Sequence, residues 1–185
     1  DGHEVAALHL LPFSWKNLEK LKFDDPGLPH KALEKYRHTG ELHKWAVMDF
    51  ILGNPDRHGQ NLMVGPEKDN FPVALIDHGS AFAGPSFDPA RDKNSFIPYY
   101  LRAWKGDSWN DLLPSQRLRA MPSLNEDSDE QLRKWLEGVH GGDLEHVLAR
   151  YGIDPGPSLE RMAKIRRLLT APSVSQAINQ LWLET

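Results

Sequence analysis

Two polar motifs follow apolar segments in the middle of this 185-residue chain, and a turn region separates them. The first motif, Asp-Arg-His-Gly-Gln-Asn, spans residues 56–61, and the second, Asp-His-Gly, begins at Asp77. The apolar stretches 61–64 and 71–76 flank a segment rich in Gly, Pro, Asp and Asn, a pattern that predicts a β-hairpin. A hairpin brings its outer ends together, so we expect Asn61 and Asp77 to lie near one another.

The residue types in the two motifs suit phosphoryl transfer. That reaction needs a carboxylate that orients or accepts the proton of the attacking hydroxyl, and oxygen ligands that hold Mg²⁺ against the nucleotide phosphates. Asp56 is the candidate for the first role, and His58 is a second candidate because imidazole titrates near neutral pH. Asn61 and Asp77 are the candidate metal ligands, while Arg57 is expected to brace the loop through an ion pair.

The order of these motifs resembles that of the phosphatidylinositol 3/4-kinase superfamily, in which Asp-Arg-His-x-x-Asn precedes Ile-Asp-x-Gly. The continuation Ile-Asp-His-Gly-Ser-Ala-Phe-Ala is most similar to the type II phosphatidylinositol 4-kinase branch, as is the aromatic string at residues 96–104. Protein kinases match less well because their loop has His-Arg-Asp before the Asn and their metal motif is Asp-Phe-Gly. The resemblance extends from about Leu8 to Trp104.

The resemblance implies an α+β fold, predominantly α: the C-terminal lobe of a protein-kinase-like fold with a short β-hairpin at the catalytic site. Only 55 residues precede Asp56, too few for the small β-rich lobe of the family, so we expect the chain to be one lobe of something longer. We expect a single domain over residues 1–185, with a hinge or edge strand at 1–13, a catalytic core at 14–110 and a helical subdomain at 111–185.

In kinase-like folds the hinge binds adenine, and the candidate apolar walls here are Leu10, Leu11 and Phe13. A plain edge strand is the equal alternative for this segment. After it, residues 14–21 predict the start of a helix capped by Ser14.

Residues 30–52 predict a helix in two pieces divided near residues 39–40. In the second piece an apolar face, which recurs every three or four residues, is expected to pack into the lobe and lead into the 56–61 loop. Asp49 lies on that face. It is expected either to pair with Arg57 or to cap loop amides, with an ordinary exposed carboxylate as the alternative.

The C-terminal part predicts four helices that carry apolar residues at helical spacing, at residues 127–140, 142–151, 158–170 and 173–182. The chain has no cysteine, which excludes disulfides and thiolate zinc sites and suits the cytoplasm. No stretch approaches the roughly 18 apolar residues of a membrane span, although peripheral membrane contact stays open. The net charge of −4 argues against a nucleic-acid binder.

Three functions agree with these motifs. The first is an ATP- and Mg²⁺-dependent kinase that transfers the γ-phosphate to a hydroxyl of a lipid, a protein or a small molecule. The second is a catalytically inactive kinase-like scaffold, although the loss of a metal ligand expected of a scaffold is not seen. The third is a protein kinase or nucleotidyl transferase of the HipA type, which would keep the same three residues.

Overall fold

The computed structural model describes residues 11, 14–36, 38–54, 57, 59–82 and 124–181. These residues form mainly helices and one small antiparallel sheet with the strand order β1-β2-β3. The prediction of an α+β fold that is predominantly α is therefore confirmed.

The sheet and two helices form one half of the structure, called here the sheet half. Its elements are β1 (Lys16–Asn17), α1 (Leu18–Asp24), α2 (Leu28–Glu34), β2 (Leu62–Val64) and β3 (Val73–Leu75), together with the 3-10 turns η1 (Gly59–Asn61) and η2 (Glu67–Asp69). An apolar cluster that includes Leu18, Leu33 and Leu62 holds this half together.

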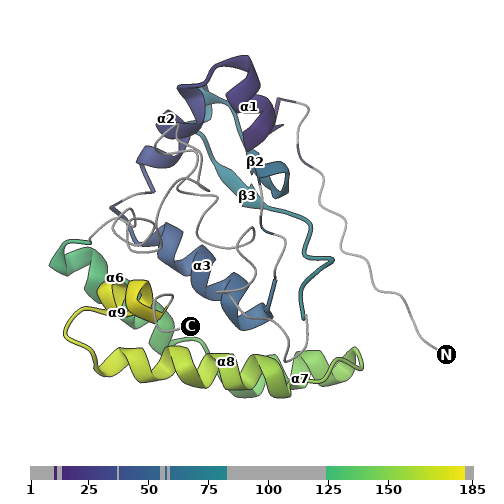
Figure 1. The fold of residues 1–185 in the computed structure, drawn as a ribbon, viewed down its shortest axis with the longest axis vertical. Coiled ribbons are helices and arrows are strands. Elements are labelled where there is room, and N and C mark those ends of the chain that lie inside the picture. Colours follow the sequence, from purple (N-terminus) through teal and green to yellow (C-terminus); the bar gives the residue numbers. More distant parts are fainter. Residues whose placement is uncertain are drawn as a thin grey trace.

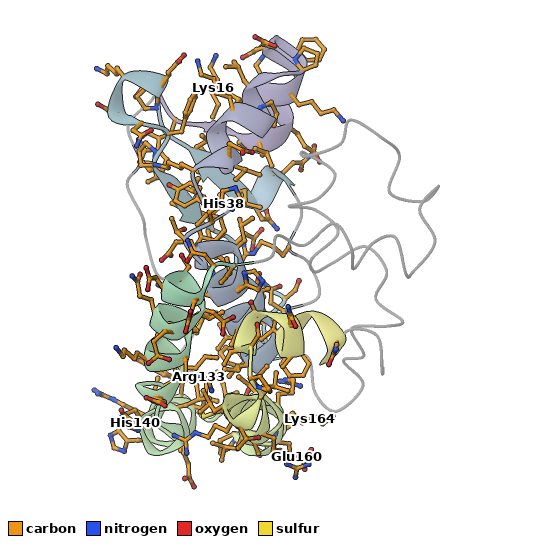
Figure 2. All side chains as sticks on the ribbon, turned by 90° about the vertical axis from the view of Figure 1, so that its left-hand side faces the viewer. Lys16, His38, Arg133, His140, Glu160 and Lys164 are labelled. Atoms are coloured by element: carbon orange, nitrogen blue, oxygen red, sulfur yellow. The ribbon has the colours of Figure 1, made fainter. Side chains whose placement is uncertain are left out.

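The second half, called here the helical half, contains α6 (Glu126–Glu137), α7 (Gly141–Arg150), α8 (Gly156–Arg167), the 3-10 turn η4 (Leu168–Thr170) and α9 (Val174–Leu181). These boundaries lie within a few residues of the four helices that the sequence predicts. The apolar residues at helical spacing on α6 and on α8 lie in one core cluster. Figure 2 shows the two halves at opposite ends, with Lys16 at the sheet end and His140 and Glu160 at the other.

Helix α3 (Glu41–Leu52) lies between the two halves (Figure 1). Its N-terminal Leu42 belongs to the cluster of the sheet half, whereas Val47 and Ile51 belong to that of the helical half. The helix is therefore buried on more than the single face that periodicity predicts. The predicted break before it is confirmed, because Gly40 has a φ of 78°, a left-handed conformation that favours glycine.

The predicted cap of the first helix is wrong. Helix α1 begins at Leu18, and its N-cap is Asn17, whose side-chain oxygen accepts a hydrogen bond from the Lys20 amide at 2.7 Å. The residues just before it form β1 instead, because Lys16 and Asn17 pair with Val64 and Met63 of β2. Pairing with β2 gives the backbone amides and carbonyls of these residues hydrogen-bond partners, which a helix extended to Ser14 would have supplied from its own backbone.

The predicted hairpin is confirmed. Strands β2 and β3 pair antiparallel, with Leu62 opposite Leu75 and Val64 opposite Val73. The connection between the two strands contains η2, and the Gly65 amide donates to the Pro72 carbonyl at 2.7 Å. This register brings Asn61, just before β2, to the end of the hairpin where β3 runs on into Asp77.

A buried aspartate of α6 caps helix α9. The Asp129 carboxylate accepts hydrogen bonds from the amides of Val174 at 2.9 Å and Ser175 at 2.8 Å, and from the hydroxyls of Ser173 and Ser175. Burial raises the pKa of Asp129, but the hydrogen bonds from Ser175, Val174 and Ser173 outweigh it and hold the pKa below the ordinary value of 3.8. The charged carboxylate therefore stabilises the fold above that pH.

Replacement of Asp129 by alanine is expected to cost about 1–2 kcal/mol, the usual range for a lost N-cap, and to lower the melting temperature by roughly 2–8 °C. The folded-state pKa is lowered, so the stabilisation is present above pH 3.8 and is lost as the pH falls through the folded value. Melting curves of both proteins should therefore converge in acid. Asp127→Ala, an exposed change in the same helical turn, is the control, and an equal loss there would contradict the capping role.

Candidate active site

The C-terminal end of α3 directs the chain into the 56–61 loop. Gly53 has a φ of 61°, and the amides of Gly53 and Asn54 donate to the carbonyls of Phe50 at 3.0 Å and Asp49 at 2.9 Å. This is the Schellman arrangement, which turns the chain sharply away from the helix axis. The predicted path from this helix into the loop is confirmed up to Asn54.

The last two carbonyls of α3 receive donors from distant parts of the chain. The Arg161 guanidinium of α8 donates to the Ile51 carbonyl at 3.2 Å, and the Phe82 amide donates to the Leu52 carbonyl at 2.6 Å. Burial lowers the pKa of Arg161 below its ordinary value. All four carbonyls that a helix leaves without an internal partner are thus satisfied here, which fixes the end of α3 that leads to the loop.

Arg57 and Asp49 form a buried ion pair, which is one of the alternatives that the sequence leaves open for Asp49. Nε and Nη2 of Arg57 donate to the two carboxylate oxygens of Asp49, each at 2.9 Å. The exposed fraction is 0% for the Arg57 side chain and 2% for that of Asp49. Two parallel charge-assisted hydrogen bonds fix the plane of the guanidinium, so the first residue of the loop that the structure describes is anchored to α3.

The same guanidinium also reaches both sides of the hairpin. Arg57 Nη1 donates to the carbonyl of Asn61 at 3.0 Å and to that of Ile76 at 2.6 Å. The Ile76 amide in turn donates to the Asn61 carbonyl at 3.1 Å. Asn61 therefore pairs with the residue that precedes Asp77, and the expected proximity of Asn61 and Asp77 is confirmed for their backbones.

Asn61 and Asp77 differ in exposure and conformation. Asn61 is 5% exposed, whereas Asp77 is exposed and has a φ of 53° in the left-handed region. Aspartate tolerates this region better than most residues because its short side chain bonds locally, and here its carboxylate accepts a hydrogen bond from the Gly79 amide at 3.2 Å. The turn leaves the Asp77 carboxylate at the surface of the hairpin end.

These two residues fit a magnesium ion bound together with a nucleotide. Mg²⁺ prefers oxygen ligands and commonly takes only one or two from the protein, with the rest from phosphates and water. An amide oxygen and a carboxylate at adjacent strand ends meet that requirement. Within the described ranges, no group of three or more His, Cys, Asp or Glu residues could hold a metal ion, so a closed protein cage is not seen there.

Several predicted residues fall outside the described part of the chain. These are the candidate proton acceptors Asp56 and His58 and two of the three candidate adenine walls, Leu10 and Phe13. The third wall, Leu11, is half-buried and lies in no helix or strand. The aromatic string at residues 96–104 is also outside the described ranges.

The structure adds two residues that the motifs did not indicate. The Asn54 side chain donates to Asp49 Oδ1 at 3.2 Å and is fully buried. Arg161 lies 110 positions after the carbonyl it contacts. Asn54 stands directly after the helix-ending Gly53, but nothing local marks Arg161, because it is one of several charged residues along α8.

A comparison of the sequence with protein-family models identifies the family of this chain. The model described as phosphatidylinositol 3- and 4-kinase matches residues 20–118, more than half of the chain. The chain belongs to this family. The match includes the loop and both candidate metal ligands. Comparisons with curated proteins and with solved structures return no match.

Membership of the phosphatidylinositol 3- and 4-kinase family identifies the chain with kinases, and so with phosphotransferases of the lipid-kinase type. The match ends at residue 118, so the helical half lies beyond it. None of the described helices is both long and apolar enough to cross a membrane. The helical half nevertheless shares its core with α3 and supports the end of α3 through Arg161.

Proposed function

We propose that the chain is the C-terminal lobe of an ATP- and Mg²⁺-dependent phosphotransferase that transfers the γ-phosphate to a hydroxyl group. The main observation in support is the position of Arg57, which joins the backbones of the two candidate metal-ligand regions at one buried guanidinium. Family membership adds the type of reaction.

In this proposal the acceptor oxygen forms a bond to the γ-phosphorus while the bond to the β-γ bridging oxygen breaks and ADP leaves. The hydroxyl proton passes to Asp56, with His58 as the second candidate. Asn61 and Asp77 each offer one oxygen to the metal ion. When bound, Mg²⁺ neutralises the charge on the nucleotide phosphates.

The other residues bind and orient. Arg57 is paired with Asp49 and buried, so it supports the loop and is not free to contact phosphate. Leu10, Leu11 and Phe13 are proposed to line the adenine site, as hinge residues do in kinase-like folds. A cytoplasmic protein, with peripheral contact to a membrane, suits a lipid-kinase relative of the type II phosphatidylinositol 4-kinase branch.

The test is made on the complete protein that contains this lobe: transfer of label from γ-labelled ATP to three acceptors assayed separately, namely phosphatidylinositol vesicles, a generic protein substrate and a small alcohol. We expect labelling of at least one acceptor with Mg²⁺, background labelling after Mg²⁺ is chelated, and recovery when Mg²⁺ is restored. A nucleotidyl transferase would release the γ-label in pyrophosphate and leave the acceptor unlabelled, so the mass of every acceptor is measured as well, and it separates a transferred phosphate from a transferred nucleotide.

Each outcome assigns a function. A product heavier by one phosphate supports the kinase, and labelling of the vesicle lipid alone supports the type II branch. A product heavier by a nucleotide would establish a nucleotidyl transferase instead. No labelling and no gain of mass by any acceptor, with folded protein and Mg²⁺ present, would favour the inactive scaffold.

A further inference from the structure

The Arg57 guanidinium contacts the backbone at both candidate metal ligands. Its Nη1 donates to the carbonyl of Asn61, which is itself a candidate ligand, and to the carbonyl of Ile76, which immediately precedes the other candidate, Asp77. One nitrogen therefore joins the two chain segments that must offer oxygens to the same ion, in addition to the hydrogen bond from the Ile76 amide to the Asn61 carbonyl. Metal sites require such separations to be held within about half an ångström.

Asp77 depends on this contact more than an ordinary strand residue would. Its φ of 53° is one that non-glycine residues adopt mainly where the surroundings hold them there. On its N-terminal side the holding contacts are those of Ile76, whose amide and carbonyl bond to Asn61 and Arg57 respectively. Loss of the guanidinium would release one of the two.

Asp49 determines where the guanidinium lies. Both of its carboxylate oxygens accept from Arg57, and Oδ1 also accepts from the Asn54 side chain. Asp49 stands on α3, and all four C-terminal carbonyls of that helix have partners. The carboxylate thus connects a rigid helix to the two ligand segments through Arg57.

Stability alone does not account for this arrangement. A buried ion pair contributes little net stability, and replacement by well-packed apolar residues is often neutral or stabilising. Apolar side chains cannot, however, donate to two carbonyls at once. The feature that only the ion pair supplies is the link between α3 and the hairpin ends.

We infer that Asp49 is a positioning residue for the metal site: it acts through Arg57 on the Asn61 and Ile76 carbonyls and thereby sets the affinity for the metal-nucleotide complex. The inference rests on the proposed function, because it takes Asn61 and Asp77 as metal ligands. It extends the role of Arg57 from supporting the loop to fixing the geometry of both ligands.

The test replaces the ion pair by apolar residues in the double variant Asp49→Leu/Arg57→Met. Mn²⁺ binding is measured from the electron paramagnetic resonance signal of the free ion, with a non-hydrolysable ATP analogue present. The melting temperature should fall, because the Asn54 side chain and the Ile76 carbonyl each lose a hydrogen bond, but the variant should stay folded at the assay temperature. We expect Mn²⁺ affinity lower by roughly 10–100-fold, the usual effect of losing a residue that orients metal ligands. Amide exchange at Ile76 should become faster in the same variant, with no metal present.

Asp129→Ala is the matched control, since it removes a buried carboxylate that caps α9 and makes none of the loop contacts described above. It should lower the melting temperature and leave Mn²⁺ affinity unchanged. Unchanged Mn²⁺ affinity in a folded double variant would overturn the inference, because the ligands would then be positioned without the ion pair.

Arg57→Lys is the second variant and decides the question if the double variant does not fold. Lysine keeps the charge but lacks the planar fork that reaches Asp49 and two carbonyls together. Weaker Mn²⁺ binding supports the inference, and native affinity overturns it. If the native protein itself binds no Mn²⁺ with the ATP analogue, the proposed function fails and the inference fails with it. If the native protein binds Mn²⁺ and the variants bind it equally well, only the inference fails.

Discussion

Asp77→Asn is expected to lower kcat/KM for Mg²⁺-dependent transfer by at least roughly a thousandfold, because a metal-ligand charge contributes several kcal/mol to the transition state. The change removes a negative charge and little else. Asparagine is close in size, tolerates the left-handed φ of 53° at this position, and keeps an oxygen that can accept from the Gly79 amide. The fold should therefore survive, and a circular dichroism melting curve checks this.

Two other variants define the effect at Asp77. Asn61→Ala should lose activity too, but less, because it removes a neutral ligand. Asp69→Asn removes the same charge from an exposed position at the other end of the same hairpin and should retain native turnover. Native turnover in Asp77→Asn would show that Asp77 does not bind the metal.

Asp56→Asn is expected to lower the rate of the chemical step by roughly two to four orders of magnitude, the range of general-base contributions. Asparagine keeps the size and hydrogen-bonding capacity of the side chain but cannot accept a proton. Single-turnover kinetics measure this step, and nucleotide affinity should change much less. The Arg57 contacts to Asp49, Asn61 and Ile76 do not involve Asp56 and should persist.

His58→Ala, assayed in parallel, identifies the proton acceptor. A large loss in Asp56→Asn with a small one in His58→Ala supports Asp56 as the base. The reverse pattern assigns the role to His58 and makes our assignment wrong. If both variants match the native protein in binding assays and no transfer is ever detected, the scaffold is the better description.

The hairpin and the helices were predictable because the signals for them are local. The apolar stretches 61–64 and 71–76 contain β2 and β3 on either side of a turn-rich segment, and the spacing of apolar residues along the C-terminal part marks α6, α7, α8 and α9. Even so, a local signal can have competitors. Ser14 and Asn17 are both good helix caps, and pairing of Lys16 and Asn17 with the edge of β2 selected the second.

The candidate site was predictable in part for the same reason. A hairpin of any kind with these ends brings Asn61 close to the residues around Asp77, so the proximity of their backbones followed from the strand pattern. Asp49 was recognisable as an unusual polar residue on an apolar helical face. The partner of Asp49 could not be predicted, because pairing with Arg57 and capping of loop amides were both compatible with its position in the helix.

Periodicity and turn residues in the chain were thus enough for the hairpin, the C-terminal helices and the order of the chemical groups, since these depend on neighbours within a few positions. The partners of the buried polar groups depend on the tertiary structure. Arg57, Asp49 and the last carbonyls of α3 lose water on burial and must each find a hydrogen bond. The donors and acceptors within reach come from Ile76, Phe82 and Arg161, which only the packing of the hairpin and α8 around α3 brings there.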